Sequence, residues 1–212
     1  MARKTKEEAL ETRARILDAA EAVFHDRGVA RTSLSDIAGA AGVTRGAIYW
    51  HFRGKADLFD AMIQRVMEPM EARLAELQRE TADAPLVWIR SLILHFLGCI
   101  AADPRCQRVF EIAWHKCEYV GEMAEIRDRH LECGNRYLGI KEDAIRHAQR
   151  LGQLSPRVDP RQAAVGLMAL VDGLVVSWTM QKQRYPLDRF AAGIVDAYLA
   201  GLVATPATEA ER

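Results

Sequence analysis

The side chains best suited to bind another molecule are concentrated in one short stretch of the chain. Residues 44–52 place an arginine, a tyrosine and a tryptophan on what would be a single short helix. An arginine can donate two hydrogen bonds to a guanine in the DNA major groove, and aromatic rings can pack on sugars or on thymine methyl groups. An isolated protein surface has little reason to expose all three. These residue types therefore indicate contact with a DNA duplex.

Other residues in the same region could anchor a phosphate backbone. Thr44 lies at an expected helix N-terminus, where a hydroxyl and a backbone N–H can bind phosphate together. We expect His51 and Lys55 to lie along the neighbouring strand. The candidate DNA-binding residues are Thr32, Ser33, Thr44, Arg45, Gly46, Tyr49, Trp50, His51 and Lys55. The alternative is a plain helical hairpin in which Tyr49 and Trp50 form a buried aromatic core.

Two short helices must hold these residues in place. Ser33 is typical of an N-cap, with Asp36 three residues later, and Gly42 permits the positive φ of a turn. Thr44 then caps a second helix that ends near Phe52. Crossed helices of this kind need small residues and an apolar inner face, which we assign to Ile37, Ala38, Ala41, Val43 and Ile48. That arrangement turns Thr44, Arg45, Gly46, Tyr49 and Trp50 outward.

The remaining periodicity is helical, and no run of alternating β-branched residues is bounded by hairpin turns. The pattern predicts a first helix over 7–27 ending at Gly28, a long helix from Gly54 with Pro69 inside it, and a last helix over 187–203. Further helix boundaries are expected at Asp83–Pro85, Asp103–Pro104, Gly152 and Asp159–Pro160, the last with Gln162 completing a capping box. The fold class is all-α, with about nine helices.

The predicted domains are a helix-turn-helix domain over 1–55, a larger ligand-binding and dimerisation domain over 56–204, and a disordered tail over 205–212. Formal net charge is +0, but residues 1–55 carry ten Lys and Arg against seven Asp and Glu. The four cysteines form no CxxC pair, so we expect reduced thiols and no structural zinc. The first residues lack the apolar stretch of a secretory signal, and the apolar run 163–178 is shorter than the roughly 20 residues of a membrane span. A cytoplasmic protein without membrane contact is expected.

Residues 44–52, followed by Lys55 and Leu58–Phe59, resemble the DNA-binding domain of TetR-family repressors. Residues 3–13 are similar, more narrowly, to AcrR-type repressors of multidrug efflux pumps, as are the blocks at 115–118, 152–154 and 171–174. The resemblance implies all-helical subunits, two-fold dimers built from the last two helices, and a ligand cavity in the larger domain. No cofactor is implied.

Dimerisation also has a physical argument of its own. A recognition helix this short reads few base pairs, so two copies must be held about one DNA turn apart. The helices expected at 160–179 and 187–203 carry apolar residues, including Trp178 and Tyr198, that exceed what one thin helical layer can bury. Packing within one chain is the alternative explanation for these residues.

The expected effector is a small hydrophobic molecule. Aromatic and methionine side chains suit an adaptable apolar site, and Asp172 is a costly carboxylate inside an apolar helix unless it is paired or lines a cavity. Asp172 could equally satisfy a cation from another helix. The candidate ligand-binding residues are Met67, Met70, Leu92, Phe96, Phe110, Trp114, Tyr137, Met168, Val171, Asp172 and Val175. Since Met67 and Met70 occupy the region where some efflux-pump repressors place an acid, neutral aromatic compounds and cationic drugs are both compatible.

Other classes of function were weighed against this hypothesis. A helical-bundle metalloprotein would need Glu-x-x-His pairs, and no histidine has a glutamate three residues before it. No glycine-rich phosphate loop and no nucleophile elbow occurs. We therefore expect a repressor and not an enzyme, with a ligand-responsive activator of the same fold as the alternative. In this hypothesis the ligand moves the long helix that starts at Lys55 and so separates the recognition helices.

Overall fold

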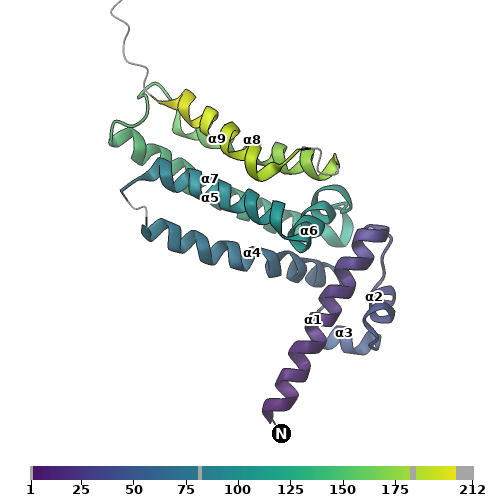
Figure 1. Cartoon of the computed structure of the whole chain (residues 1–212). Helices are drawn as coiled ribbons and strands as arrows, with labels where there is room; N and C mark the ends of the chain where they lie inside the picture. The colour runs from purple at the N-terminus through teal and green to yellow at the C-terminus, as the bar shows by residue number, and fades with distance from the viewer. Residues whose placement is uncertain (1, 81–82, 182–184, 204–212) are drawn as a thin grey trace, which may run out of the picture. The chain divides into compact units, whose positions relative to one another are not determined.

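The computed structural model describes residues 2–80, 83–181 and 185–203, and these ranges hold nine α-helices and one 3-10 helix (Figure 1). The helices are α1 (Ala2–Arg27), α2 (Leu34–Ala41), α3 (Arg45–His51), α4 (Lys55–Glu80), α5 (Pro85–Ala102), α6 (Pro104–His115), η1 (Gly121–Met123), α7 (Ala124–Arg150), α8 (Pro160–Met180) and α9 (Leu187–Leu202). No strand occurs in these ranges, which confirms the all-α prediction. The predicted tail 205–212 lies outside the described residues.

The helix ends follow from the capping residues that the sequence predicted. The Ser33 hydroxyl accepts a hydrogen bond from the Asp36 backbone N–H, and the Asp36 carboxylate accepts one from the Ser33 backbone N–H. Asp103 and Asp159 likewise cap α6 and α8, each followed by a proline. At the start of α8 only the half of the predicted capping box in which Asp159 accepts from the Gln162 backbone is seen. These helix starts can be predicted from the sequence because a capping residue and its partner lie at most three positions apart in the chain.

The chain packs as two compact units. One contains the described residues within 1–69 and 103–130, and the other contains the described residues within 70–102 and 131–203, so that α4 and α7 each continue from one unit into the other. This division differs from the predicted boundary after Lys55, because the first half of α4 and the segment around α6 pack with the N-terminal helices. The local hydrophobic periodicity of the sequence does not predict that residues 103–130 pack with the N-terminal helices.

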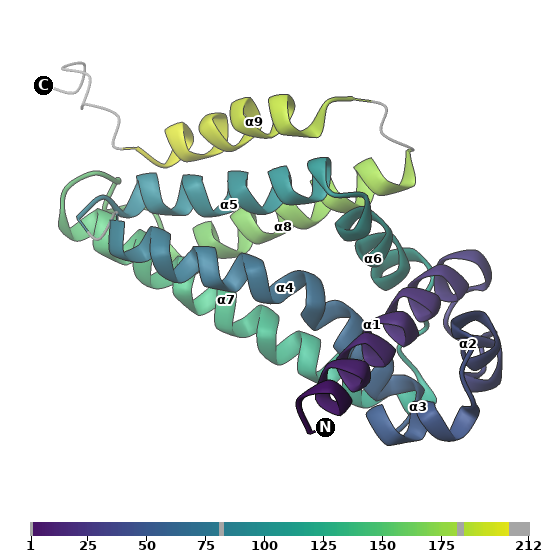
Figure 2. The ribbon, with the colours of Figure 1, turned by 60° about the horizontal axis from the view of Figure 1, so that its bottom comes forward.

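In the first unit, α1 packs against α2, α3 and α6, and α2 packs against α3 (Figure 2). Its core is made of large apolar side chains that are completely buried: Ile16, Leu17, Phe24, Ile37, Ile48, Leu58 and Phe59. Phe24 and Phe59 meet edge to face with their ring centroids 6.0 Å apart. This core fixes α3 against α1, and therefore determines which face of α3 is exposed to solvent.

In the second unit, α5 packs against α8 and α9, and α8 packs against α9 (Figure 1). Within the described residues, α5 and α8 are long and apolar enough to cross a membrane by length and composition alone. For α8 this corrects the estimate made from the apolar run, since the helix is 21 residues long. Core helices of soluble proteins pass the same test, so one or two such helices are weak evidence for a membrane span.

Candidate nucleic-acid interface

Helices α2 and α3 form the crossed pair that the sequence predicted. Gly42 ends α2 with a φ of 64°, a left-handed conformation that favours glycine. Its backbone N–H donates to the carbonyls of Ala38 and Gly39. The Thr44 hydroxyl accepts a hydrogen bond from the Ala47 backbone N–H at 3.1 Å and starts α3. Ile37 and Ile48 are fully buried between the helices, whereas Ala41 and Val43 are half-buried.

The outer face of α3 carries the side chains expected to read DNA. Thr44, Arg45 and Gly46 are exposed, Tyr49 keeps 48% of its surface exposed, and Trp50 keeps 73%. The hairpin alternative, in which the two aromatic side chains are buried, is therefore wrong. The Arg45 guanidinium donates to the Tyr49 hydroxyl at 3.0 Å and lies 5.4 Å from the centroid of its ring. Tyr49 thus holds the Arg45 guanidinium in one orientation. Binding a base would therefore cost less conformational entropy of the arginine side chain.

His51 lies at the end of α3, half-buried beside α1. Its ring meets the Trp50 ring edge to face, with centroids 4.5 Å apart. Burial lowers the pKa of His51, and the charge of Arg13 on α1 lowers it further. The Arg13 guanidinium lies 5.2 Å from the centroid of the Phe52 ring. The sequence did not single out Arg13, because its approach to α3 depends on how α1 packs.

Two of the predicted DNA-contacting residues are placed differently. Thr32 is only 2% exposed, and its hydroxyl donates to the Gly28 carbonyl at 2.8 Å. The Lys55 ammonium donates to the carbonyls of Val29 and Thr32, both at 3.2 Å, and pairs with Glu122 at 2.8 Å. Both side chains are thus engaged inside the first unit, so we leave them out of the proposed phosphate contacts. Ser33 is exposed at the start of α2, as expected.

The predicted effector residues are divided between the two units. In the first unit, Met67 and Phe110 are half-buried, while Trp114 is 48% exposed. The second unit holds the other eight: Met70, Val171 and Val175 are buried, and Leu92, Phe96, Tyr137, Met168 and Asp172 are half-buried.

The second unit also holds an acid on α4 that the sequence did not single out. The Tyr137 hydroxyl donates to the Glu71 carboxylate at 2.8 Å, and Arg136 pairs with the same oxygen at 2.9 Å. Burial and this hydrogen bond raise the pKa of Tyr137. Nothing in the sequence indicated this acid, because its partner Tyr137 on α7 is 66 residues away and leaves no local pattern.

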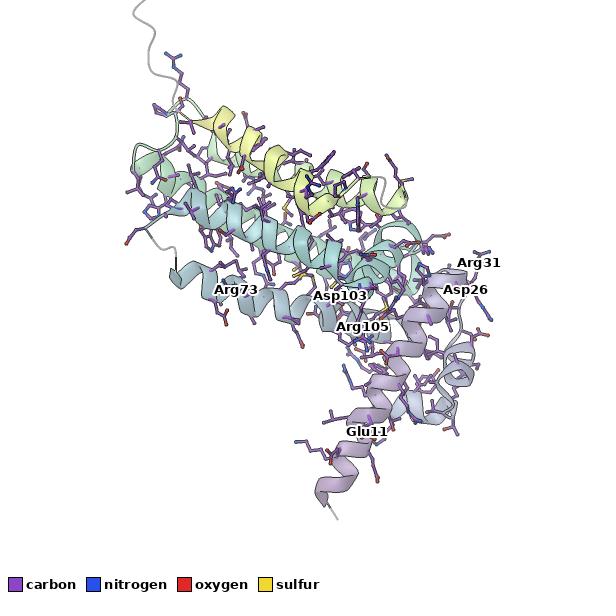
Figure 3. All side chains as sticks on the ribbon, viewed as in Figure 1. Glu11, Asp26, Arg31, Arg73, Asp103 and Arg105 are labelled. Atoms are coloured by element: carbon purple, nitrogen blue, oxygen red, sulfur yellow. The ribbon has the colours of Figure 1, made fainter. Side chains whose placement is uncertain are left out.

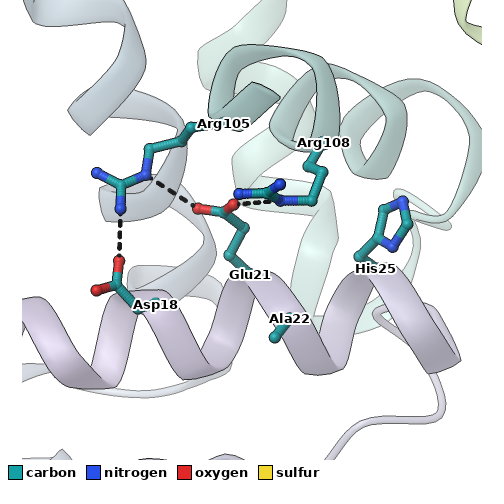
Figure 4. Close-up of a pocket in the computed structure, with 6 residues that line it drawn as sticks. All are labelled: Asp18, Glu21, Ala22, His25, Arg105 and Arg108. Atoms are coloured by element: carbon teal, nitrogen blue, oxygen red, sulfur yellow. Dashed lines mark hydrogen bonds and ion pairs between the residues drawn. The ribbon is translucent and has the colours of Figure 1, made fainter. Parts of the chain in front are cut away.

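A charged hollow of about 320 Å³ lies between α1 and α6 in the first unit (Figure 4). The Glu21 carboxylate, 4% exposed, pairs with Arg65 at 3.0 Å, with Arg105 at 3.5 Å and with Arg108 at 2.7 Å. Asp18 adds pairs with Arg65 and Arg105. Figure 3 labels Arg105 and Asp103 at the start of α6. The network ties three helices together, and no pattern within a single helix predicts it.

The described residues include no group of three or more His, Cys, Asp or Glu side chains that could hold a metal ion. All four cysteines are free thiols. What the structure does offer is an all-helical unit that exposes a short helix with an arginine and two aromatic residues. This arrangement defines the chain as a helix-turn-helix DNA-binding protein by fold and by site.

Comparison with known proteins identifies the family. Residues 16–62 match the family described as "Bacterial regulatory proteins, tetR family", and residues 84–203 match the C-terminal region of MAATS-type transcriptional repressors. The transcriptional regulator TtgR of Pseudomonas putida is 45% identical over 184 residues, which cover 85% of this chain and 86% of TtgR. The chain belongs to the TetR family of bacterial transcriptional regulators, and it is a regulator rather than an enzyme.

Two solved structures are similar over nearly the whole chain. NalD, the secondary repressor of the MexAB-OprM multidrug efflux pump in Pseudomonas aeruginosa, has a TM-score of 0.85 and 32% identity, covering 94% of this chain and 100% of its own. SmeT, the repressor of the Stenotrophomonas maltophilia pump SmeDEF, in complex with triclosan has a TM-score of 0.78 and 33% identity, covering 95% and 98%. These similarities confirm the predicted fold and the narrower resemblance to regulators of multidrug efflux.

Proposed function

We propose that this protein is a cytoplasmic, dimeric repressor of a multidrug efflux pump, which binds palindromic operator DNA and is released by a small hydrophobic compound. The observation that carries the proposal is the exposed face of α3, with Arg45, Tyr49 and Trp50. Trp50 is 73% exposed, and a DNA major groove would cover its ring. The pump as target is supported by what NalD and SmeT repress.

The proposed DNA contacts are Arg45 to a guanine edge, Tyr49 and Trp50 to sugars or thymine methyl groups, and Thr44, Gly46, Ser33 and His51 to the backbone. Thr44 and Gly46 are exposed at the N-terminus of α3, where backbone N–H groups favour phosphate. One such helix reads too few base pairs for useful specificity, so two copies act together on a two-fold operator.

The proposed surface between the two copies is the outer face of α8 and α9. Large apolar side chains remain exposed there, including Val165 (47%), Met180 (66%) and Phe190 (52%). Phe190 stacks on Tyr185 with a centroid separation of 5.4 Å. Large apolar side chains that remain exposed on two neighbouring helices are typical of a subunit interface.

Of the residues predicted from the sequence, we propose those in the second unit as effector contacts, with α4 as the connection to the DNA-binding end. α4 runs without interruption from Lys55 to Glu80 and includes Pro69. Because α4 belongs to both units, a displacement of its C-terminal half by a bound effector would also displace its N-terminal end. A coupling free energy of about 1–3 kcal/mol would change operator affinity by roughly 5–150-fold.

A mobility-shift assay with the DNA upstream of the protein's own gene tests the proposal. We expect a retarded complex that disappears when a hydrophobic inducer such as triclosan is added to saturation. Operator affinity that stays the same at every inducer concentration would contradict the release mechanism. A reporter gene behind the same DNA should be expressed more when the regulator is deleted; lower expression would instead identify an activator.

A further inference from the structure

A lysine lies buried in the second unit without a strong partner. Lys141, on α7, is only 8% exposed. Its ammonium contacts the Met168 sulfur at 3.7 Å and lies 5.6 Å from the centroid of the Tyr137 ring. Among the described residues, it makes no hydrogen bond to oxygen or nitrogen and no ion pair within 4 Å. Three N–H donors are therefore buried beside a weak acceptor and an aromatic face only.

A buried ammonium in such surroundings is unfavourable unless another molecule completes its hydrogen bonds. Lysine is among the residue types that are almost never fully buried without a partner. Burial lowers the pKa of Lys141, and the charge of Asp172 opposes that effect. Asp172 lies one helical turn beyond Met168 on α8, and within the described chain it too makes no hydrogen bond or ion pair. Asp172 therefore opposes the effect of burial on the pKa of Lys141 without binding the ammonium, and burial raises the pKa of Asp172 itself.

The residues around Lys141 are those already proposed as effector contacts. Tyr137 and Met168 touch it, and Asp172 acts on it electrostatically. The sequence did not single out Lys141, because a lysine among the many polar residues of α7 is expected to be exposed to solvent. The burial of Lys141 results from the packing of α7 against the other helices of the second unit.

We propose that Lys141 is the polar anchor of the effector site and selects aromatic compounds that carry a carboxylate or phenolate oxygen. This inference rests on the proposed function and specifies the chemistry of the effector. An anionic oxygen supplies the acceptor that the ammonium lacks, in a charge-assisted hydrogen bond. The rest of the ligand would lie against the Tyr137 ring and the Met168 thioether. A cationic drug would bring a like charge toward the ammonium and bind less tightly.

Matched naphthalene compounds test the selectivity. We expect 2-naphthoate to bind the wild-type dimer more tightly than 2-naphthylmethylammonium, by about ten-fold or more, as measured by calorimetry and by release from operator DNA. In the Lys141→Met variant the affinity for 2-naphthoate should fall to that of the uncharged 2-naphthalenemethanol. Wild-type protein that does not bind 2-naphthoate, or that prefers the ammonium compound, would overturn the inference.

Thermal unfolding of the ligand-free protein separates a binding lysine from a structural one. The substituted methionine nearly retains the length of the side chain and removes the uncompensated charge, so the Tm of Lys141→Met should be unchanged or higher. The matched control is Lys116→Met, since the Lys116 ammonium donates to the His25 carbonyl at 2.7 Å and pairs with Glu111 at 2.8 Å. This control should have a lower Tm.

The result that overturns the inference is a lower Tm for Lys141→Met together with unchanged affinity for 2-naphthoate, since Lys141 would then be structural. Normal operator binding by the wild type in the same experiment would leave the proposed function intact. Absence of operator binding by the wild type would refute the proposed function, and this inference with it.

Discussion

Lys55 shows how one side chain can lie next to the recognition helix and still serve the fold. Its ammonium bonds to two backbone carbonyls that precede α2 and to the Glu122 carboxylate. Only 13% of the side chain is exposed. A phosphate contact would require it to abandon these three partners. We therefore infer that Lys55 holds the segment before α2 in position.

Replacing Lys55 with alanine should accordingly affect stability. We expect Lys55→Ala to lower the free energy of unfolding by about 1.5–3 kcal/mol, because the carbonyls of the buried residues Val29 and Thr32 lose a charged donor. The neighbouring control is Arg53→Ala, since the Arg53 side chain is 83% exposed and its ion pair should contribute little. Urea denaturation measures both. If Lys55→Ala retained stability and reduced the salt slope of DNA binding by about one, Lys55 would be a phosphate contact after all.

We expect His130 to make the stability of the protein sensitive to acid. Burial lowers its pKa below the ordinary value of 6.5, Arg129 lowers it further, and Asp60 opposes both. The buried Nε2 atom has no hydrogen-bond partner among the described residues. As the pH falls below 6.5, the unfolded chain takes up a proton that the folded chain resists, so stability decreases.

The variant His130→Phe should therefore lose less stability between pH 7 and pH 5 than the wild type. Phenylalanine keeps an aromatic ring beside Tyr119 and Phe59, which lie 5.6 and 6.4 Å from the His130 ring, and it does not titrate. Thermal unfolding across this pH range measures the difference. Parallel curves for the two proteins would show that His130 contributes nothing to the acid sensitivity.

At the scale of helices, α8 and α9 approach each other through a glycine. A Cβ atom added at Gly166 would lie 2.4 Å from the Tyr198 hydroxyl oxygen, which donates to the Ala163 carbonyl at 2.8 Å. Tyr198 must therefore move if residue 166 has a side chain, and we expect this movement to weaken its hydrogen bond.

We expect Gly166→Ala to destabilise the protein by about 1–3 kcal/mol through this overpacking. Gly173, on the same helix, has no heavy atom within 4 Å of an added Cβ. Gly173→Ala should therefore stabilise the protein by up to about 1 kcal/mol, since alanine favours the helix. Chemical denaturation compares the two variants. Equal effects would show that α8 and α9 do not meet at Gly166.

The pairing of α1 with α4 and α6 depends on Glu21. Its carboxylate pairs with Arg65, Arg105 and Arg108. We expect Glu21→Gln to lower the free energy of unfolding by about 1–3 kcal/mol, because the arginines lose a buried counter-charge while remaining partly solvated. The control is Glu11→Gln at an exposed position of α1 (Figure 3), which should change stability little. A stable Glu21→Gln variant would contradict a structural role of the network.

Element boundaries were predictable because their causes are local. Ser33, Thr44, Asp103 and Asp159 each cap the helix that follows, and Gly42 takes the left-handed conformation that its position required. The burial of Thr32 and Lys55 was not predictable, because it results from partners brought together by packing. The same is true of the link from Glu71 to Tyr137 and of the arginines around Glu21.

For the whole molecule, the two sites differ in how much of each the sequence could predict. Arg45, Tyr49 and Trp50 lie within six residues on one helix, so helical periodicity alone predicts that they share an exposed face. The proposed effector residues of the second unit come from four helices, α4, α5, α7 and α8. Composition identifies such residues as apolar, but which of them meet, and that Lys141 is buried among them, depends on tertiary packing.

The measurement that tests the account most directly is the affinity of wild type and Arg45→Ala for the operator and for operators with single base changes. The account predicts that Arg45→Ala loses about 1–3 kcal/mol of binding free energy and no longer discriminates at one base-pair position, while its stability stays that of the wild type. Equal affinity and equal base preference for the two proteins would contradict recognition of DNA by the exposed face of α3.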